Sequence, residues 1–230
     1  MAARRLGFRF LGTTKSKLPS EAKLGHQIVN LTYPPDSGYL LDIINVWLDD
    51  EYGIRQVESE PEVVVDIGGN IGLFTLWAWS HFPDAKLFTF EPNPRVFEQL
   101  KKNLAPTRAQ ISRVGVSSKP GFASMNDITD SRMASTTSMD NGDIELCSLS
   151  QVVADVGGKI DLLKMDCEGA EWDIFKDKGA FAAIDAIRME YHLDDLHTVE
   201  TLESMTEELG YRMIHHSPNQ GFGIAWFDKK

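Results

Sequence analysis

The chain has 230 residues, a formal net charge of −11 and 42% hydrophobic residues. That length suits one sizeable α/β domain and leaves little room for a second. Because an acidic protein is repelled by a phosphate backbone, we expect a small-molecule partner rather than bulk nucleic acid. The only cysteines are Cys147 and Cys167, which predicts no disulfide framework and favours a reducing, cytoplasmic location. No apolar run approaches the roughly 20 residues that span a bilayer.

Residues 1–60 are predicted to form an N-terminal tail and helical extension, ahead of a main domain over residues 61–230. The basic start of the chain is interpreted as a frayed tail, with an organelle-targeting segment as the alternative. Residues 36–52 predict an amphipathic helix over one end of the sheet. The aromatic residues of this region either cover an apolar edge or form a substrate lid; they are Tyr33, Tyr39, Trp47 and Tyr52.

From residue 62 onward, apolar strands alternate with helical patterns. Repeated βα units predict a doubly wound α/β sheet, mostly parallel, with ligands at the carboxyl ends of its strands. A closing β-β pair predicts that the last strand is antiparallel. Residues 117–143 keep no period and are predicted to form a long loop or an irregular hairpin. The expected strands are 62–66, 86–91, 110–116, 159–166, 186–191, 211–216 and 222–227, and the expected helices are 71–81, 94–104, 149–156, 170–178 and 198–209.

The turn after the first strand reads Asp-Ile-Gly-Gly-Asn-Ile-Gly over residues 66–72. Gly68 and Gly72 permit positive φ angles and a close backbone approach to a ligand. Asn70 stands where the dinucleotide fingerprint G-x-G-x-x-G has its second glycine. Asp66 would repel a pyrophosphate but attract the positive charges of S-adenosylmethionine, so the turn favours that cofactor. The alternative is that Asp66 only caps the turn.

Glu91 ends the second predicted strand, 25 residues after Asp66. A carboxylate at this position is expected to accept hydrogen bonds from both hydroxyls of a ribose. Pro92 and Asn93 follow it in a stiff turn, and Asn93 is a candidate N-cap for the next helix. Alone, Glu91 is one carboxylate at a strand end. Together with the glycine turn, it indicates an adenosine-type ligand.

Two further segments carry candidate catalytic residues at strand ends. The first, residues 163–171, holds Asp166, Glu168 and Glu171, although one of these could simply cap the following helix. It lacks the Asn/Asp-Pro-Pro-aromatic pattern of amino-methylating DNA enzymes. The second segment ends in His192, our candidate general base, with Glu190 or Asp166 as the group that orients it.

At this point the motifs resemble the FkbM family of methyltransferases. The similar pieces run in family order from about residue 44 to residue 192: INVWLDDEYG, VVVDIGGNIGLFTL, FTFEPNP, KIDLLKMDCEGAEWDIF and IRMEYH. The resemblance implies a seven-stranded, Rossmann-like class I methyltransferase fold with an antiparallel terminal strand. It also implies O-methylation, often of sugars or natural products.

The resemblance places the methionine part of S-adenosylmethionine near Asp66, Gly68 and Asn70, the ribose on Glu91, and Asp166 beside the reactive methyl group. The full expected cofactor-binding set is Asp66, Gly68, Gly69, Asn70, Gly72, Glu91, Pro92, Asn93, Val116 and Asp166, and the expected catalytic set is His192, Asp166 and Glu190.

Three alternatives to O-methylation without a metal remain open at this stage. In the first, Asp166 and neighbouring carboxylates hold a divalent ion that acidifies the acceptor, although no metal ligand is assigned. In the second, the protein methylates a nitrogen atom. In the third, a catalytically inactive domain binds the cofactor and serves as an interaction module. The expected partner is a hydroxylated small molecule, with no nucleic acid and no membrane, and the oligomeric state stays open.

Overall fold

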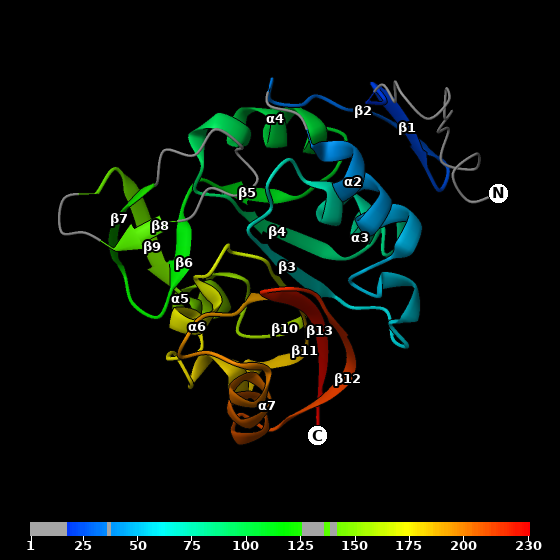
Figure 1. Cartoon of the computed structure of the whole chain (residues 1–230). Coiled ribbons are helices and arrows are strands. Elements are labelled where there is room, and N and C mark those ends of the chain that lie inside the picture. Colours follow the sequence, from blue (N-terminus) through cyan, green and yellow to red (C-terminus); the bar gives the residue numbers. More distant parts are fainter. Residues whose placement is uncertain (1–17, 36–37, 126–135, 139–141) are drawn as a thin grey trace.

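The computed structural model describes residues 18–35, 38–125, 136–138 and 142–230. Its centre is a seven-stranded sheet in the order β12-β13-β11-β10-β3-β4-β5 (Figure 1). The strands are β3 (Val63–Ile67), β4 (Lys86–Phe90), β5 (Gln110–Ser112), β10 (Ile160–Met165), β11 (Ile184–His192), β12 (Tyr211–Pro218) and β13 (Phe222–Lys229).

Strands β3, β4, β5, β10 and β11 pair in parallel, and β13 pairs antiparallel to both β11 and β12. The predicted fold class and the antiparallel last strand are therefore confirmed. Since parallel strands end at the same edge of a sheet, the ends of β3, β4, β10 and β11 bring four separate sequence segments together.

The two faces of the sheet carry separate apolar cores. Alternate residues of β3 belong to different cores: Val64 packs with helices α3 (Leu73–His81) and α4 (Pro94–Leu104). Val63 and Val65 pack on the opposite side with α5 (Leu149–Asp155), α6 (Glu171–Ile174) and α7 (Val199–Glu208). A central strand buried on both faces explains the uninterrupted Val-Val-Val run.

Local capping agrees with the sequence. The Asn93 side chain accepts a hydrogen bond from the Arg95 N–H, and Pro94 is the first residue of α4. Thr198 caps α7, with a reciprocal contact to Thr201. These helices begin where their capping residues predict.

The region around residues 110–148 differs from its prediction. The expected strand over 110–116 is divided between β5 and β6 (Gly115–Ser117), which belongs to a second sheet in the order β6-β9-β7-β8. Strands β7 (Gly121–Met125) and β8 (Thr136–Ser138) pair antiparallel, as an irregular hairpin would, and β9 (Ile144–Ser148) was not predicted. The core of this sheet contains few residues, so its apolar pattern is faint. Residues 126–135 and 139–141 of the predicted loop lie outside the described residues.

The helix expected over 170–178 is also shorter than predicted. Only Glu171–Ile174 is α-helical. The chain continues with turn-like bonds, from the Lys176 N–H to the Asp173 carbonyl and from the Asp177 N–H to the Ile174 carbonyl. It then forms a 3-10 helix, η4 (Ala180–Ala183). The i→i+3 bonds tighten and end the helix early.

The N-terminal segment, meaning residues 18–35 and 38–60, packs against the main sheet's helices. A hairpin of β1 (Glu21–Leu24) and β2 (Gln27–Asn30), which was not predicted, precedes α2 (Tyr39–Ile43). Helix α2 runs into a π-helix, η1 (Ile44–Asp49), and a 3-10 turn, η2 (Ile54–Gln56), follows (Figure 1). Both η1 and η2 contact α3. The predicted amphipathic helix is thus present over residues 39–49. The basic tail, residues 1–17, lies outside the described residues.

Buried contacts join the N-terminal segment to the rest of the chain. The fully buried Asn103 side chain accepts hydrogen bonds from the Thr32 N–H and hydroxyl, and donates to the carbonyls of Thr32 and Ile71. The aromatic residues of the segment share one core with α3 and α4. None of the helices in the described parts of the chain has the length and apolarity needed to cross a bilayer.

Candidate active site

The loop after β3 has the backbone that its sequence predicts. Gly68, Asn70 and Gly72 all have left-handed φ angles, of 75°, 48° and 90°. The N–H groups of Gly68 and Gly69 both donate to the Phe90 carbonyl at the end of β4. A methyl group on Gly68 would overlap the Asp166 carbonyl oxygen. The loop therefore lies directly against the ends of β4 and β10.

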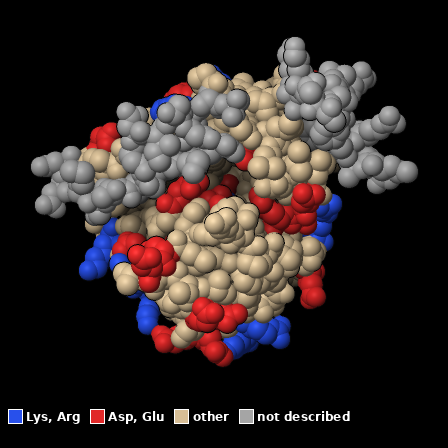
Figure 2. All heavy atoms as spheres, in the orientation of Figure 1, with Lys and Arg blue, Asp and Glu red and all other residues tan. Residues whose placement is uncertain are grey.

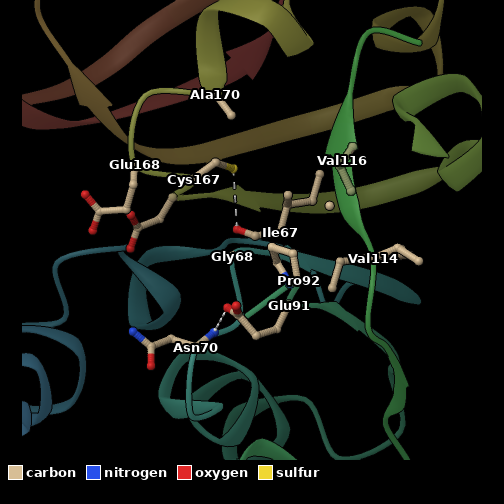
Figure 3. A pocket seen from close by; sticks show the side chains of 13 residues that line it. Ile67, Gly68, Asn70, Glu91, Pro92, Val114, Val116, Cys167, Glu168 and Ala170 are labelled. Carbon is tan, nitrogen blue, oxygen red and sulfur yellow. Dashed lines mark hydrogen bonds between the residues drawn. The ribbon is translucent and has the colours of Figure 1, made fainter. Parts of the chain in front are cut away.

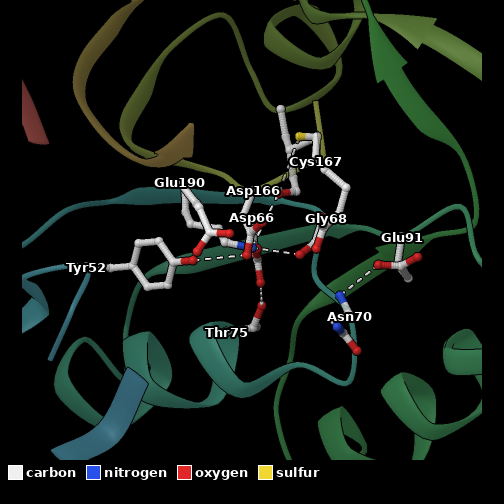
Figure 4. Close-up of polar contacts among 12 residues, drawn as sticks. Tyr52, Asp66, Gly68, Asn70, Thr75, Glu91, Asp166, Cys167 and Glu190 are labelled. Carbon is white, nitrogen blue, oxygen red and sulfur yellow. Dashed lines mark hydrogen bonds and ion pairs between the residues drawn. The ribbon is translucent and has the colours of Figure 1, made fainter. Parts of the chain in front are cut away.

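Asp66 lies beneath this loop and is 1% exposed. Its Oδ2 accepts a hydrogen bond of 2.6 Å from the Thr75 hydroxyl, and its Oδ1 is 3.1 Å from Nζ of Lys164 (Figure 4). Lys164 stands next to Asp66 in the β10–β3 register. The buried ammonium also donates to the Gly68 carbonyl at 2.6 Å. Asp66 is thus an internal counter-ion that holds Lys164 under the loop.

The environment of Lys164 keeps its ammonium charged. Burial alone would lower its pKa, but the negative charges of Asp66 and Asp166 raise it above its ordinary value. The Asp166 Oδ2 is 3.8 Å from Nζ, farther than the Asp66 oxygen. Lys164 therefore neutralises Asp66 first and Asp166 only in part.

Glu91 leaves the end of β4 and is 6% exposed. One oxygen accepts a hydrogen bond of 2.8 Å from the Asn70 N–H (Figure 3), and the other accepts one of 2.7 Å from the Asn93 N–H. Burial raises the pKa of Glu91 to about 7, although both backbone hydrogen bonds act to lower it. Glu91 is thus a fixed carboxylate tied to the glycine loop.

Two adjoining cavities open at this edge of the sheet. Both are lined by Gly68, Asn70, Asp166 and Glu168. The first cavity extends toward Glu91 (Figure 3), and its other lining residues are Ile67, Phe90, Pro92, Val114, Gly115, Val116, Cys167 and Ala170. The second cavity extends toward the N-terminal segment, with Tyr39, Leu41, Asp42, Asn45, Val46, Glu51, Tyr52, Gly69, Ile71, Leu73, Phe74, Lys164, Glu190, His192 and Phe222.

The cavities contain most of the predicted site residues. Gly68, Asn70, Glu91, Pro92, Val116 and Asp166 line the first cavity, and Gly69, His192 and Glu190 line the second. Three of the predicted residues line neither. Asp66 is buried below the loop, Gly72 packs against Leu100 and Leu104, and Asn93 caps α4 while donating its N–H to Glu91.

His192 lies among three carboxylates. Its Nε2 is 3.3 Å from Glu190 and 3.4 Å from Glu168, and its Nδ1 is 3.7 Å from Glu171. Burial lowers its pKa, but the nearby carboxylates of Glu171, Glu190 and Glu168 raise it to about 11. The imidazole is therefore protonated at neutral pH, a state that sequence reasoning did not anticipate.

The carboxylates around the second cavity repel one another. Burial and the charges of Asp166 and Glu190 raise the pKa of both Glu51 and Glu168 to about 8, although His192 acts to lower that of Glu168. Burial and Asp166 also raise the pKa of Glu190. Figure 2 shows Asp and Glu atoms gathered around a hollow near the middle of one face. The walls of the second cavity therefore carry more acidic than basic side chains.

Several residues of this site were not among the predicted catalytic or cofactor-binding residues, including Lys164 and Glu168. Glu51 and Tyr52 come from the N-terminal segment, and both line the second cavity. In the sequence, Tyr52 is only one of several aromatic residues ahead of the first strand. No set of three or more His, Cys, Asp or Glu side chains in the described ranges is arranged to hold a metal ion.

A Gly68→Ala substitution tests the close contact between the loop and β10. Left-handed backbone costs a side chain about 1–3 kcal/mol, and here the methyl group would also displace the Asp166 carbonyl. Gly221→Ala is the matched control, because Gly221 also has a positive φ, of 80°, but open space around its Cβ position. We expect Gly68→Ala to lower the free energy of unfolding in urea clearly more than Gly221→Ala. Equal losses would contradict the packing described for the loop.

The raised pKa of Glu51 predicts a pH-dependent stability. With a folded-state value of about 8 and an ordinary value of 4.5, the folded chain keeps a proton that the unfolded chain loses between these limits. The free energy of unfolding therefore falls as pH rises through this window. A Gln at position 51 has no proton to lose. The free energy of unfolding of Glu51→Gln minus that of wild type should therefore be larger at pH 9 than at pH 5. Urea titrations at both pH values measure these free energies of unfolding. Glu58 is exposed, so the Glu58→Gln control should differ from wild type by the same amount at pH 5 and at pH 9.

Comparison with known proteins assigns the chain to a family. Residues 66–213 match the model of the methyltransferase FkbM domain. The chain is 30% identical over 173 residues to methyltransferase sdnD of Sordaria araneosa, covering 57% of this chain and 65% of that protein. It is 32% identical over 93 residues to the 31-O-demethyl-FK506 methyltransferase FkbM of Streptomyces tacrolimicus, covering 39% of this chain and 36% of that protein. The chain thus spans less than two thirds of either relative.

Among solved structures, the yhhF protein of Escherichia coli is similar with a TM-score of 0.50 and 13% identity, over 89% of this chain and 92% of that one. This likeness concerns the fold alone and agrees with the class I methyltransferase architecture. The family model covers more than half of the chain and includes the glycine loop, Glu91, Asp166 and His192. The chain therefore belongs to the FkbM family of methyltransferases.

Proposed function

We propose that the protein transfers a methyl group from S-adenosylmethionine to a hydroxyl group of a small molecule. One observation carries the proposal: two cavities meet at Gly68, Asn70, Asp166 and Glu168. The first cavity has features that suit a nucleoside, and the second is large enough for an acceptor. A donor and an acceptor held on either side of one junction react as an effectively unimolecular pair.

The first cavity fits an adenosine group by its chemistry. Its walls include the apolar side chains of Ile67, Phe90 and Val116, which suit a base. The Glu91 carboxylate is held in place by two backbone N–H groups and has lone pairs left for a ribose diol. No Lys or Arg occurs among the described residues that line this cavity, and the Asp166 carboxylate on its wall would repel a pyrophosphate. This composition favours S-adenosylmethionine over a dinucleotide.

The glycine loop is proposed to hold the methionine part of the cofactor. Gly68 and Asn70 line both cavities, and Gly69 lines the second. Asp66 contributes from below, because its pairing with Lys164 fixes the ammonium that binds the Gly68 carbonyl. Asp66, Gly72 and Asn93 therefore support the cofactor site through the loop and helix α4, rather than as walls of a cavity.

The second cavity is proposed to hold the acceptor. Its volume of about 360 Å³ lies within the range of roughly 300–1,000 Å³ found for small-molecule sites. Leu41, Val46, Phe74 and Phe222 offer apolar walls beside the carboxylates. When bound, S-adenosylmethionine supplies an electrophilic methyl group, whose C–S bond breaks as a C–O bond forms, while the acceptor hydroxyl releases its proton to a base.

Glu190 is our proposed proton acceptor. It lines the second cavity, and its raised pKa makes it a better base at neutral pH than an ordinary carboxylate. His192, which we first expected to be the base, is a cation in this setting and has no free site for another proton. We propose that His192 instead orients Glu190 and Glu168 through its Nε2 contacts. Asp166 faces the junction between the cavities.

One relative supports oxygen as the methylated atom, because the Streptomyces protein is named for an O-demethyl substrate. Metal assistance remains the rival mechanism, since carboxylates line the acceptor cavity. Loss of methyl transfer after exhaustive chelation, with recovery on adding a divalent ion, would favour that rival. An N-methyltransferase would be identified by product analysis, and an inactive binding module by cofactor binding without any turnover.

Cofactor binding is tested by isothermal titration with S-adenosylmethionine and with NADH. We expect the wild-type protein to bind S-adenosylmethionine and not NADH. Glu91→Gln should weaken S-adenosylmethionine binding about tenfold to a hundredfold, because hydrogen bonds to a charged acceptor are worth about 1.5–3 kcal/mol. Glu98→Gln is the control, since Glu98 is exposed on α4 and should leave binding unchanged. Binding of NADH alone would overturn the proposal.

The role of Glu190 is tested by methyl transfer from labelled S-adenosylmethionine to a panel of hydroxylated small molecules. With any acceptor that reacts, Glu190→Gln should lower kcat by about 10²–10⁴-fold, the usual contribution of a general base. Its affinity for S-adenosylmethionine should stay within about twofold of wild type, because Glu190 lies outside the first cavity. Full turnover by Glu190→Gln would show that another group accepts the proton of the acceptor hydroxyl.

A further inference from the structure

Tyr52 belongs to the N-terminal segment but reaches the centre of the site. Its buried hydroxyl donates a hydrogen bond of 3.0 Å to Oδ2 of Asp166 (Figure 4). Its ring packs edge-on against Phe74 at 5.5 Å, and Nζ of Lys164 lies 5.6 Å from the ring centroid. The ring is therefore held by packing, so the direction of the hydroxyl is fixed.

The turn that carries Tyr52, residues 50–53, is anchored on both sides. Asp50 accepts a hydrogen bond of 2.7 Å from the indole N–H of Trp77 on α3. The Glu51 carbonyl accepts one of 2.7 Å from the indole N–H of Trp226 on β13. Gly53 lies against the Trp226 ring with no room for a side chain. These contacts anchor the turn, which forms part of the wall of the second cavity.

Asp166 has two competing partners at the junction of the cavities. Its Oδ2 is 3.0 Å from the Tyr52 hydroxyl and 3.8 Å from Nζ of Lys164. The Lys164 ammonium is already engaged by Asp66 and by the Gly68 carbonyl. Without the phenol, Asp166 would be free to turn closer to Lys164 and away from the junction. The hydrogen bond from Tyr52 opposes that movement.

We propose that Tyr52 is a positioning residue that holds the Asp166 carboxylate at the junction of the two cavities, where its charge favours a sulfonium over a neutral sulfur. The inference rests on the proposed function, which places the sulfur of the cofactor between the cavities. A carboxylate near a sulfonium gains Coulomb energy that it does not gain from the uncharged sulfur of S-adenosylhomocysteine. Tyr52 lies outside residues 66–213, so the family match alone does not identify it.

The test compares the dissociation constants of S-adenosylmethionine and S-adenosylhomocysteine, each measured by isothermal titration. Tyr52→Phe keeps the ring and removes only the hydroxyl. We expect it to reduce the preference for S-adenosylmethionine about threefold to tenfold, while thermal melting shows that the fold is retained. Tyr33→Phe is the matched control, because the Tyr33 hydroxyl donates to the Pro19 carbonyl, away from the cavities. In this variant the ratio of the two dissociation constants should equal that of wild type.

Asp166→Asn separates an effect through Asp166 from a general structural effect. This variant should reduce the same ratio at least as much as Tyr52→Phe, and adding Tyr52→Phe to it should change nothing more. An unchanged ratio in Tyr52→Phe or Asp166→Asn, or an additive loss in the double variant, would overturn the inference. Failure of wild type to bind either compound would instead overturn the proposed function, so the two failures are distinguishable.

Discussion

The buried ammonium of Lys164 is the interaction on which the rest of the site depends. It joins the carboxyl ends of β3 and β10 by pairing with Asp66 and donating to the Gly68 carbonyl. A buried ion pair of this kind adds little net stability, but removing one partner leaves an uncompensated charge. Its value here is geometric, because one cation fixes the loop backbone and also limits where Asp166 can lie.

A second constraint is the excess of acid groups around the second cavity. The pKa values of Glu51, Glu168 and Glu190 are raised because burial and the neighbouring carboxylates disfavour the ionised form of each group. His192 offsets part of that repulsion by staying protonated. The pKa values of these acidic groups are thus shifted toward neutral pH. Such shifts suit acid–base chemistry but lower the stability of the fold.

Much of the fold follows from local patterns. The Val-Val-Val run of β3, the Asn93 cap and the glycine turn are local signals, and each is where the sequence predicts it. The small sheet of β6 to β9 was missed because its short strands surround a core of few residues. The charge state of His192 and the role of Tyr52 depend on contacts between distant segments, such as Tyr52 with Asp166, 114 residues apart. No local pattern encodes such pairs.

The hydrogen bond of the Trp226 indole affects the order in which parts of the chain can fold during synthesis. Its N–H binds the Glu51 carbonyl, which lies 175 residues earlier in the sequence. A ribosome releases the segment around Glu51 long before the strand that carries Trp226. During synthesis the Tyr52 turn therefore lacks the Trp226 contact, and the second cavity takes its final shape only when β13 enters the sheet. The partners that hold the glycine loop, Phe90 and Lys164, are synthesised before Trp226, so the loop can form before this wall of the second cavity is complete.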